Sequence, residues 1–151
     1  MYTIEEYDKE KSKVLRYVLY KKRSKQEIKN KFYNSIEDEM LNEIIDELEE
    51  NGYINDRNYI ERTINEFVAL NNLSLKEVRY KLASKGISND LIEDYINEHA
   101  EEMEEYEIKS AKMIIIKKQS TMEEESIIQF LMKKGYKTKN IRQAIELLDE
   151  N

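Results

Sequence analysis

The chain has 151 residues, 40% hydrophobic and 38% charged, with a formal net charge of −7. This apolar content suffices for one compact domain or a short array, which excludes a disordered tail. The net acidity argues against a strong nonspecific nucleic-acid binder, because such proteins present excess lysine and arginine to phosphates. Proline is absent and only three glycines occur, which favours helices over strands and turns.

A first group of three helices opens the chain. Apolar residues at helical spacing predict a helix over residues 5–22. Ser24 and Glu27 then form a capping box, which begins a second, short helix. Ser35 is expected to cap a third helix, and Gly52 fits the left-handed position that ends it. The apolar face of this third helix comprises Ile36, Met40, Leu41, Ile44, Ile45 and Leu48.

A second group follows at once, because Asp56 is placed to cap a fourth helix. Ser74 and Glu77 repeat the capping box, and the fifth helix that they begin closes at Gly86. Ser88 is expected to cap a sixth helix. The inward face of this helix is expected to comprise Leu91, Ile92, Tyr95, Ile96 and Met103.

A third group is less sharply marked. A helix is expected around residues 107–118, and Thr121 with Glu124 offers a third capping box. The helix after this box leads to Gly135. Thr138 is expected to cap the last helix.

Equivalent apolar positions recur with a period of about 45–50 residues, which is typical of stacked repeats. Superposition of the three groups aligns Ile28 with Val78 and Ile127, and Phe32 with Leu82 and Leu131. The sequence therefore predicts an all-α fold in which three tandem three-helix repeats stack into an elongated, curved array. We expect repeat boundaries at residues 1–55, 56–106 and 107–151.

Few residues in this sequence are suited to catalysis. With no cysteine and one histidine, a Cys–His nucleophile, a tetrahedral zinc site and a Glu-x-x-His di-iron pair are excluded. No glycine loop for phosphate is present either. His99 is interpreted as a helix-surface residue, and the acidic runs, such as the eight acids of residues 93–107, as solvated helix faces. We expect no enzyme activity, no cofactor and no metal.

The sequence also lacks signals for a membrane or for export. No apolar run approaches the roughly 18–20 residues that span a bilayer. The first residues, MYTIEEYDKEKSK, lack the charged-then-apolar order of a signal peptide. The expectation is a soluble cytoplasmic protein.

The most specific motif lies in residues 48–96. The segment LEENGYINDRNYI, followed by SLKEVRYKLASKGISNDLIEDYI, resembles the RecX family of bacterial modulators of the RecA recombinase. The family pattern is a Gly-aromatic turn followed by Asp, a second aromatic residue, and a short helix that ends in Lys-Gly-Ile. The first group departs from it, because FYNSI replaces LASKGI and loses the glycine. The matching residues are Gly52, Tyr53, Ile54, Asn55, Asp56, Tyr59, Leu82, Lys85, Gly86 and Ile87.

The resemblance implies a non-enzymatic regulator that binds the filament of RecA on single-stranded DNA. It would modulate strand exchange and co-protease activity in recombination, DNA repair and the SOS response. Its partner would be the RecA filament, with single-stranded DNA contacted mainly through that filament, and the chain is expected to be a monomer.

Basic residues concentrate in the first and second helices of the groups, and these helices are expected to face the filament. Lys81 and Lys85 are four residues apart and share one helix face. A helical-repeat adaptor between proteins, without a nucleic-acid role, would suit the same charge pattern. A helix-turn-helix DNA regulator is disfavoured by the net acidity. The candidate filament contacts are Arg57, Arg62, Arg79, Lys81 and Lys85.

Overall fold

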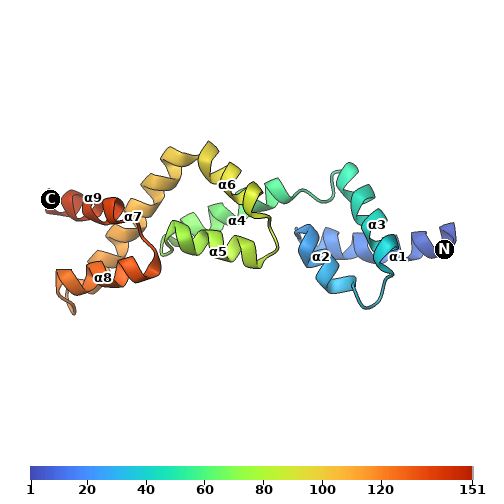
Figure 1. Ribbon diagram of the computed structural model, residues 1–151, viewed down its shortest axis with the longest axis horizontal. Coiled ribbons are helices and arrows are strands. Elements are labelled where there is room, and N and C mark those ends of the chain that lie inside the picture. The colour runs from blue at the N-terminus through green and yellow to red at the C-terminus, as the bar shows by residue number, and fades with distance from the viewer. Residues whose placement is uncertain (151) are drawn as a thin grey trace.

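The computed structural model describes residues 1–150, and this part of the chain forms nine α-helices and no strand. The predicted all-α class is confirmed. Three groups of three helices follow one another along the long axis of an elongated molecule (Figure 1). The helices are α1 (Ile4–Tyr20), α2 (Lys25–Phe32), α3 (Asp38–Glu50), α4 (Asp56–Leu70), α5 (Leu75–Ser84), α6 (Asn89–Glu98), α7 (Ala100–Lys118), α8 (Glu124–Lys134) and α9 (Thr138–Asp149).

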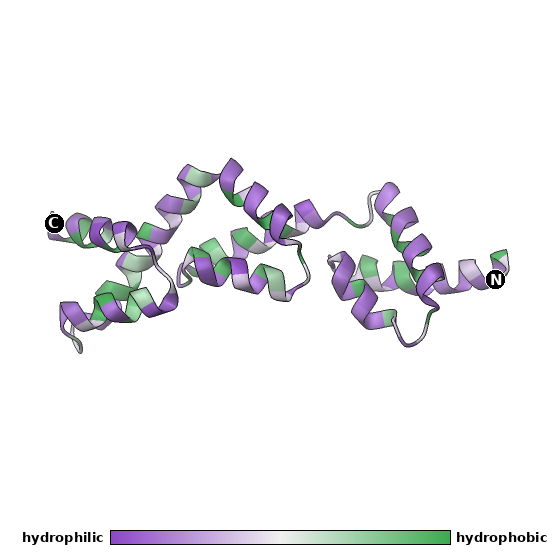
Figure 2. Ribbon diagram, viewed as in Figure 1, coloured by the Kyte–Doolittle hydropathy of each residue, from purple (hydrophilic) through white to green (hydrophobic). Residues whose placement is uncertain are grey.

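Each group of helices encloses its own hydrophobic cluster. The first cluster contains Val14 and Ile44, the second Ile60 and Leu82, and the third several residues around Leu131. Hydrophobic segments gather where the helices of one group face each other, and hydrophilic segments cover the outer faces (Figure 2). The division at residues 1–55, 56–106 and 107–151 remains a prediction, and the three separate clusters support it.

Several helix ends form as the sequence predicts. The capping boxes at Ser24 and Ser74 are both present, and the Ser88 hydroxyl accepts the Leu91 amide. Gly52 and Gly86 have φ angles of +83° and +86°, the left-handed conformation expected of residues that end helices. These two positions are therefore suited to glycine.

Four predicted caps are wrong. The Ser35 hydroxyl donates to the Phe32 carbonyl and the Thr121 hydroxyl to the Lys118 carbonyl, each turned back onto the preceding helix end. Asn55, one residue before Asp56, caps α4 by accepting the Asn58 amide at 3.1 Å. Thr138 is the first residue of α9, whose N-cap Lys137 makes no side-chain cap.

The junction between α6 and α7 also differs from the prediction. The helix breaks at His99, whose φ is −117°, and α7 begins at Ala100 rather than near residue 107. Met103 is buried as expected, but in α7 instead of α6. His99 is partly exposed, and its ring stacks on Tyr95 with centroids 4.1 Å apart.

The second helices of the three repeats lie head to tail. The Ser24 hydroxyl, at the start of α2, donates to the Lys85 carbonyl at the end of α5 at 2.7 Å. The Ser74 hydroxyl, at the start of α5, donates to the Lys134 carbonyl at the end of α8 at the same distance. Each hydroxyl also accepts an amide of its own helix, as a cap does. We call these two contacts the first joint, between repeats one and two, and the second joint, between repeats two and three.

A carboxylate from the next repeat completes each joint. Asp56 accepts the Lys25 amide at the start of α2 at 3.1 Å, so its role is across the joint rather than at its own helix end. At the second joint the buried Glu107 accepts the Leu75 amide at 2.7 Å. Glu107 also accepts the Lys137 amide at 2.9 Å and thereby ties repeat two to the third helix of repeat three. These bonds satisfy backbone donors that a helix start leaves unpaired.

Glycine allows the close approach at both joints. A Cβ atom on Gly86 would lie 2.0 Å from the Cβ of Gln26, and one on Gly135 would lie 2.8 Å from the Cβ of Lys76. A Cβ on Gly52 would meet nothing within 4 Å. Gly52 therefore serves only its turn, whereas Gly86 serves both a turn and a joint.

This difference predicts unequal costs for two alanine substitutions. Gly52→Ala should lower the free energy of unfolding by about 1 kcal/mol, the usual cost of a left-handed residue with a side chain. Gly86→Ala should cost about 2–4 kcal/mol, because its methyl group also displaces the start of α2. Urea unfolding followed by circular dichroism measures both. Equal costs would show that the first joint tolerates the methyl group.

A second pair of variants separates the joint from the cap. Ser88→Ala removes a cap alone and should cost about 1 kcal/mol. Ser74→Ala removes a cap and the bond to the Lys134 carbonyl, and should cost about 2 kcal/mol or more. The same unfolding measurement applies, and a Ser74 variant as stable as the Ser88 variant would contradict the role of the joint.

Candidate functional site

A basic cleft lies at the first joint. It encloses about 180 Å³, and four cationic side chains line it together with the single carboxylate of Glu66. The cations are Lys21, Lys22, Arg62 and Lys85. The aromatic rings of Tyr59 and Phe67 and the Thr63 side chain complete the lining. The cleft therefore combines excess positive charge with aromatic surface.

Three elements bring these cations together. Lys21 and Lys22 directly follow the end of α1, and Arg62 lies on α4. Lys85 is the C-cap of α5, and its carbonyl accepts the Ser24 hydroxyl of the first joint. The joint thus fixes the backbone of one cation beside the start of α2, although Lys85 is 61 residues from Ser24 in sequence.

Little negative charge offsets these cations. Glu66 lies 3.8 Å from Arg62 in a contact between two well-exposed side chains, so this contact contributes little. Glu27 is engaged by the Ser24 amide and by the Tyr59 phenol. Burial and the bond to Glu27 raise the pKa of Tyr59 above its ordinary range, so its phenol stays neutral. An anionic ligand would therefore meet cations rather than competing carboxylates.

The structure separates the five candidate contacts predicted from the sequence. Arg62 and Lys85 lie together in the basic cleft. Arg57 pairs with Glu98, and the Arg79 guanidinium lies 2.7 Å from the Glu93 carboxylate. Lys81 is exposed outside the cleft. The structure contains no filament, so all five residues remain predicted filament contacts.

The remaining motif residues have structural roles in this region. Tyr53 is half exposed beside the Gly52 turn, and Tyr59 is buried. Asp56 contacts the start of α2, and burial raises the pKa of its carboxyl. The motif around Gly86 builds the first joint and so holds the basic cleft in place.

Sequence reasoning missed two of the four cations. Lys21 and Lys22 belong to the run KKR, which stands in a strongly basic stretch at the end of the first predicted helix. Arg23 completes this run, with its guanidinium 4.0 Å from the centre of the Tyr17 ring. The basic run could have indicated a positively charged surface. That it lies beside Arg62 could not be predicted, because the first joint sets the relative position of the two repeats.

The surface between α4 and α7 carries mixed charge. A cleft of about 450 Å³ lies between α4 and α7. Its ionisable residues are Glu102, Glu105 and Lys109, and Tyr106 forms part of the wall.

Two kinds of feature are missing from the part of the chain that the structure describes. Among residues 1–150, no group of three or more His, Cys, Asp and Glu side chains could hold a metal ion. No helix within the same range is long and apolar enough to cross a membrane.

The fold and the cleft define an all-helical protein with a positively charged cleft at the first joint. No family model matches the chain. It is 30% identical over 139 residues to "Regulatory protein RecX" of Staphylococcus carnosus (strain TM300), covering 89% of this chain and 52% of that protein. It is 22% identical over 141 residues to "Regulatory protein RecX" of Prosthecochloris aestuarii (strain DSM 271 / SK 413), covering 93% of each.

A solved structure extends the similarity to the fold. The crystal structure of RecX from Lactobacillus salivarius superposes with a TM-score of 0.82 at 23% identity, over 99% of this chain and all of that one. The predicted resemblance is therefore confirmed: this chain is similar in sequence to proteins named regulatory protein RecX and shares the fold of a RecX structure. It spans about half the length of the first curated relatives that it matches, including the staphylococcal one.

Proposed function

We propose that this chain is a RecX-like regulatory protein that binds the RecA filament on single-stranded DNA and modulates recombinase and co-protease activity. The observation that carries the proposal is the similarity to proteins named regulatory protein RecX over most of the chain. In this proposal the chain acts as a cytoplasmic monomer, without catalysis or a cofactor, and reaches single-stranded DNA mainly through the filament.

The basic cleft supplies a physical basis for the filament contact. Its cations would face an anionic surface, either the phosphates of the bound strand or acidic patches of the recombinase. The acidic helices, such as α3 and the first half of α7, would face basic protein surface. An elongated array with separated charges can contact several neighbouring subunits of one filament at once.

The proposal ranks the five candidate contacts by their surroundings. Arg62 and Lys85 converge in the basic cleft and become the primary contacts of the proposal. Lys81, exposed on the same helix face as Lys85, would extend the contact. Arg57 and Arg79 would contribute less, because each already pairs with a glutamate.

The proposal predicts that Arg62→Glu with Lys85→Glu weakens filament binding. We expect the affinity at low salt to fall by about tenfold or more, because two positive charges opposite an anionic surface become negative. Added salt should weaken the wild-type complex more than the variant complex. Fluorescence anisotropy with labelled protein, titrated with RecA assembled on oligo(dT), measures both effects.

The matched control is Lys117→Glu with Lys133→Glu, which makes the same charge change on exposed residues of the third repeat. It should bind filaments nearly as well as wild type. If both double variants lose affinity equally, net charge and not the cleft governs binding. If wild type does not bind filaments but captures a bacterial protein after nuclease treatment, the adaptor function replaces the proposal.

A further inference from the structure

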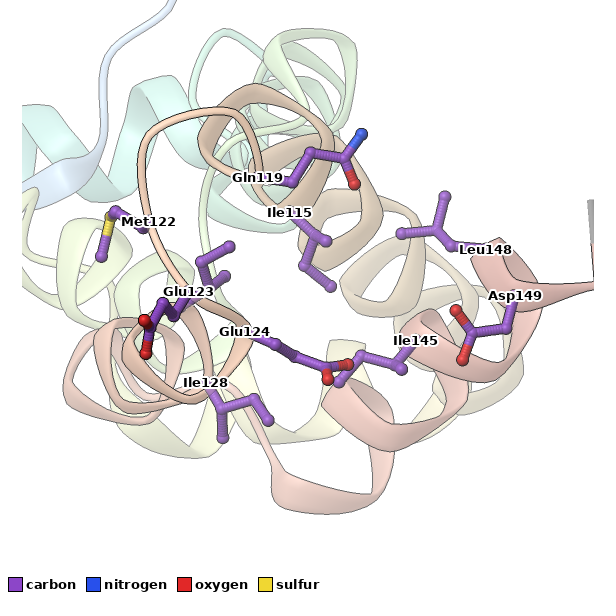
Figure 3. Close-up of a pocket in the computed structure, with 10 residues that line it drawn as sticks. Ile115, Gln119, Met122, Glu123, Glu124, Ile128, Ile145, Leu148 and Asp149 are labelled. Atoms are coloured by element: carbon purple, nitrogen blue, oxygen red, sulfur yellow. The ribbon is translucent and has the colours of Figure 1, made fainter.

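A second cleft lies in the third repeat, at the start of α8 and away from both joints. It encloses about 500 Å³ between α7, α8 and α9. Carboxylates border it, and in Figure 3 the Glu124 side chain reaches from α8 toward Asp149 at the end of α9. Among its apolar residues, Met122, Ile128, Ile145 and Leu148 are only partly buried. We call it the end cleft.

The end cleft occupies the position at which a further joint would form. The alignment of Ile28 with Ile127 places Glu123 and Glu124 at the positions of Ser24 and Lys25. Asp149 matches Glu49 near the end of the third helix of the repeat. At the first joint, the surface around Lys25 and Glu49 faces Gly86 and Ser88 of the next repeat. The end cleft is thus the third-repeat equivalent of a surface that forms an interface in the first repeat.

Its chemistry differs from that of the joints. At both joints the N-cap hydroxyl, on Ser24 or Ser74, donates to a carbonyl of the following repeat. Glu123 is the N-cap residue of α8, and its carboxylate has no proton to donate to a carbonyl. Ile128 replaces Lys29, which lines the first joint, so the surface is also more apolar. A further repeat of the same kind would lose its main joint bond here.

We propose that the end cleft binds a basic amphipathic helix of a partner protein. Apolar residues on one face of that helix would cover Met122, Ile128 and Leu148. Lysine or arginine beside them would pair with Glu123, Glu124 and Asp149. The proposal concerns a surface remote from the basic cleft and does not depend on filament binding.

A second copy of this chain is a poor occupant. Two end clefts facing each other would oppose carboxylates to carboxylates. Gly86 and Gly135 allow the ends of α5 and α8 to pack closely on the start of another helix. The equivalent turn in the first repeat, FYNSI, has no glycine, so the first repeat of another copy could not approach the end cleft in the same way. Neither arrangement matches both the shape and the charge of the end cleft.

The probe is a lactam-stabilised helix about four turns long, with leucines on one face and lysines beside them. It is added to the full chain, and its anisotropy and the methyl signals of the isoleucines are followed. We expect saturable binding with shifts concentrated at Ile128 and Ile145. A matched peptide with glutamate in place of lysine should not bind.

Protein variants locate the site. Glu124→Lys with Asp149→Lys should weaken peptide binding by about tenfold or more, because two favourable charge pairs become repulsive. Glu146→Lys with Glu125→Lys, on the exposed faces of the same two helices, should leave binding nearly unchanged. Circular dichroism melts verify the fold of each variant.

Three results would overturn the proposal. One is the absence of saturable binding by the lysine peptide. Another is equal binding by the cleft variant and its control. The third is self-association of the wild-type chain in sedimentation that the cleft variant abolishes, since a second copy would then be the occupant.

Discussion

A single serine hydroxyl performs two tasks at each joint, and the arrangement of the array depends on this coincidence. Ser24 and Ser74 each accept an amide that begins their own helix and donate to a carbonyl that ends a helix of the next repeat. One oxygen therefore satisfies two backbone groups that helix ends leave unpaired. Because both partners are backbone, the contact fixes the relative position of the repeats regardless of surface side chains.

Surface charge is consequently free to vary between joints. The first joint carries the basic cleft around Arg62, and the region beside the second carries Glu102 and Glu105. Glu123 replaces the serine altogether where no third joint forms among the described residues. The construction of the joints therefore does not constrain the charge of the surfaces beside them.

Much of the fold could be predicted because its signals are local. Ser24 with Glu27 and Ser74 with Glu77 mark helix starts within four residues, and both boxes are present. The cap expected at Asp56 failed because the cue for a helix start also suits the neighbouring Asn55. A shift of one residue leaves the helix intact but changes which side chain is available to a neighbour.

The assembled surfaces were less accessible to sequence reasoning. The Lys85 carbonyl that receives the Ser24 hydroxyl is a backbone group and leaves no signature in sequence. Glu107 stands in an acidic run that suggested a solvated face, yet it is fully buried and bonded to two backbone amides. Lys21 and Arg62 line the same cleft, but this could not be predicted without knowing how the first two repeats are placed relative to each other.

The head-to-tail row of α8, α5 and α2 gives the molecule a sense of direction. Each peptide dipole in these helices points the same way along the row, so the two ends of the protein are electrically unlike. A filament of identical subunits is likewise polar, with distinguishable ends. Two polar objects laid side by side can be parallel or antiparallel, and these pairings differ in energy. The array is therefore polar along its length, and its two possible orientations on any polar filament would differ in energy.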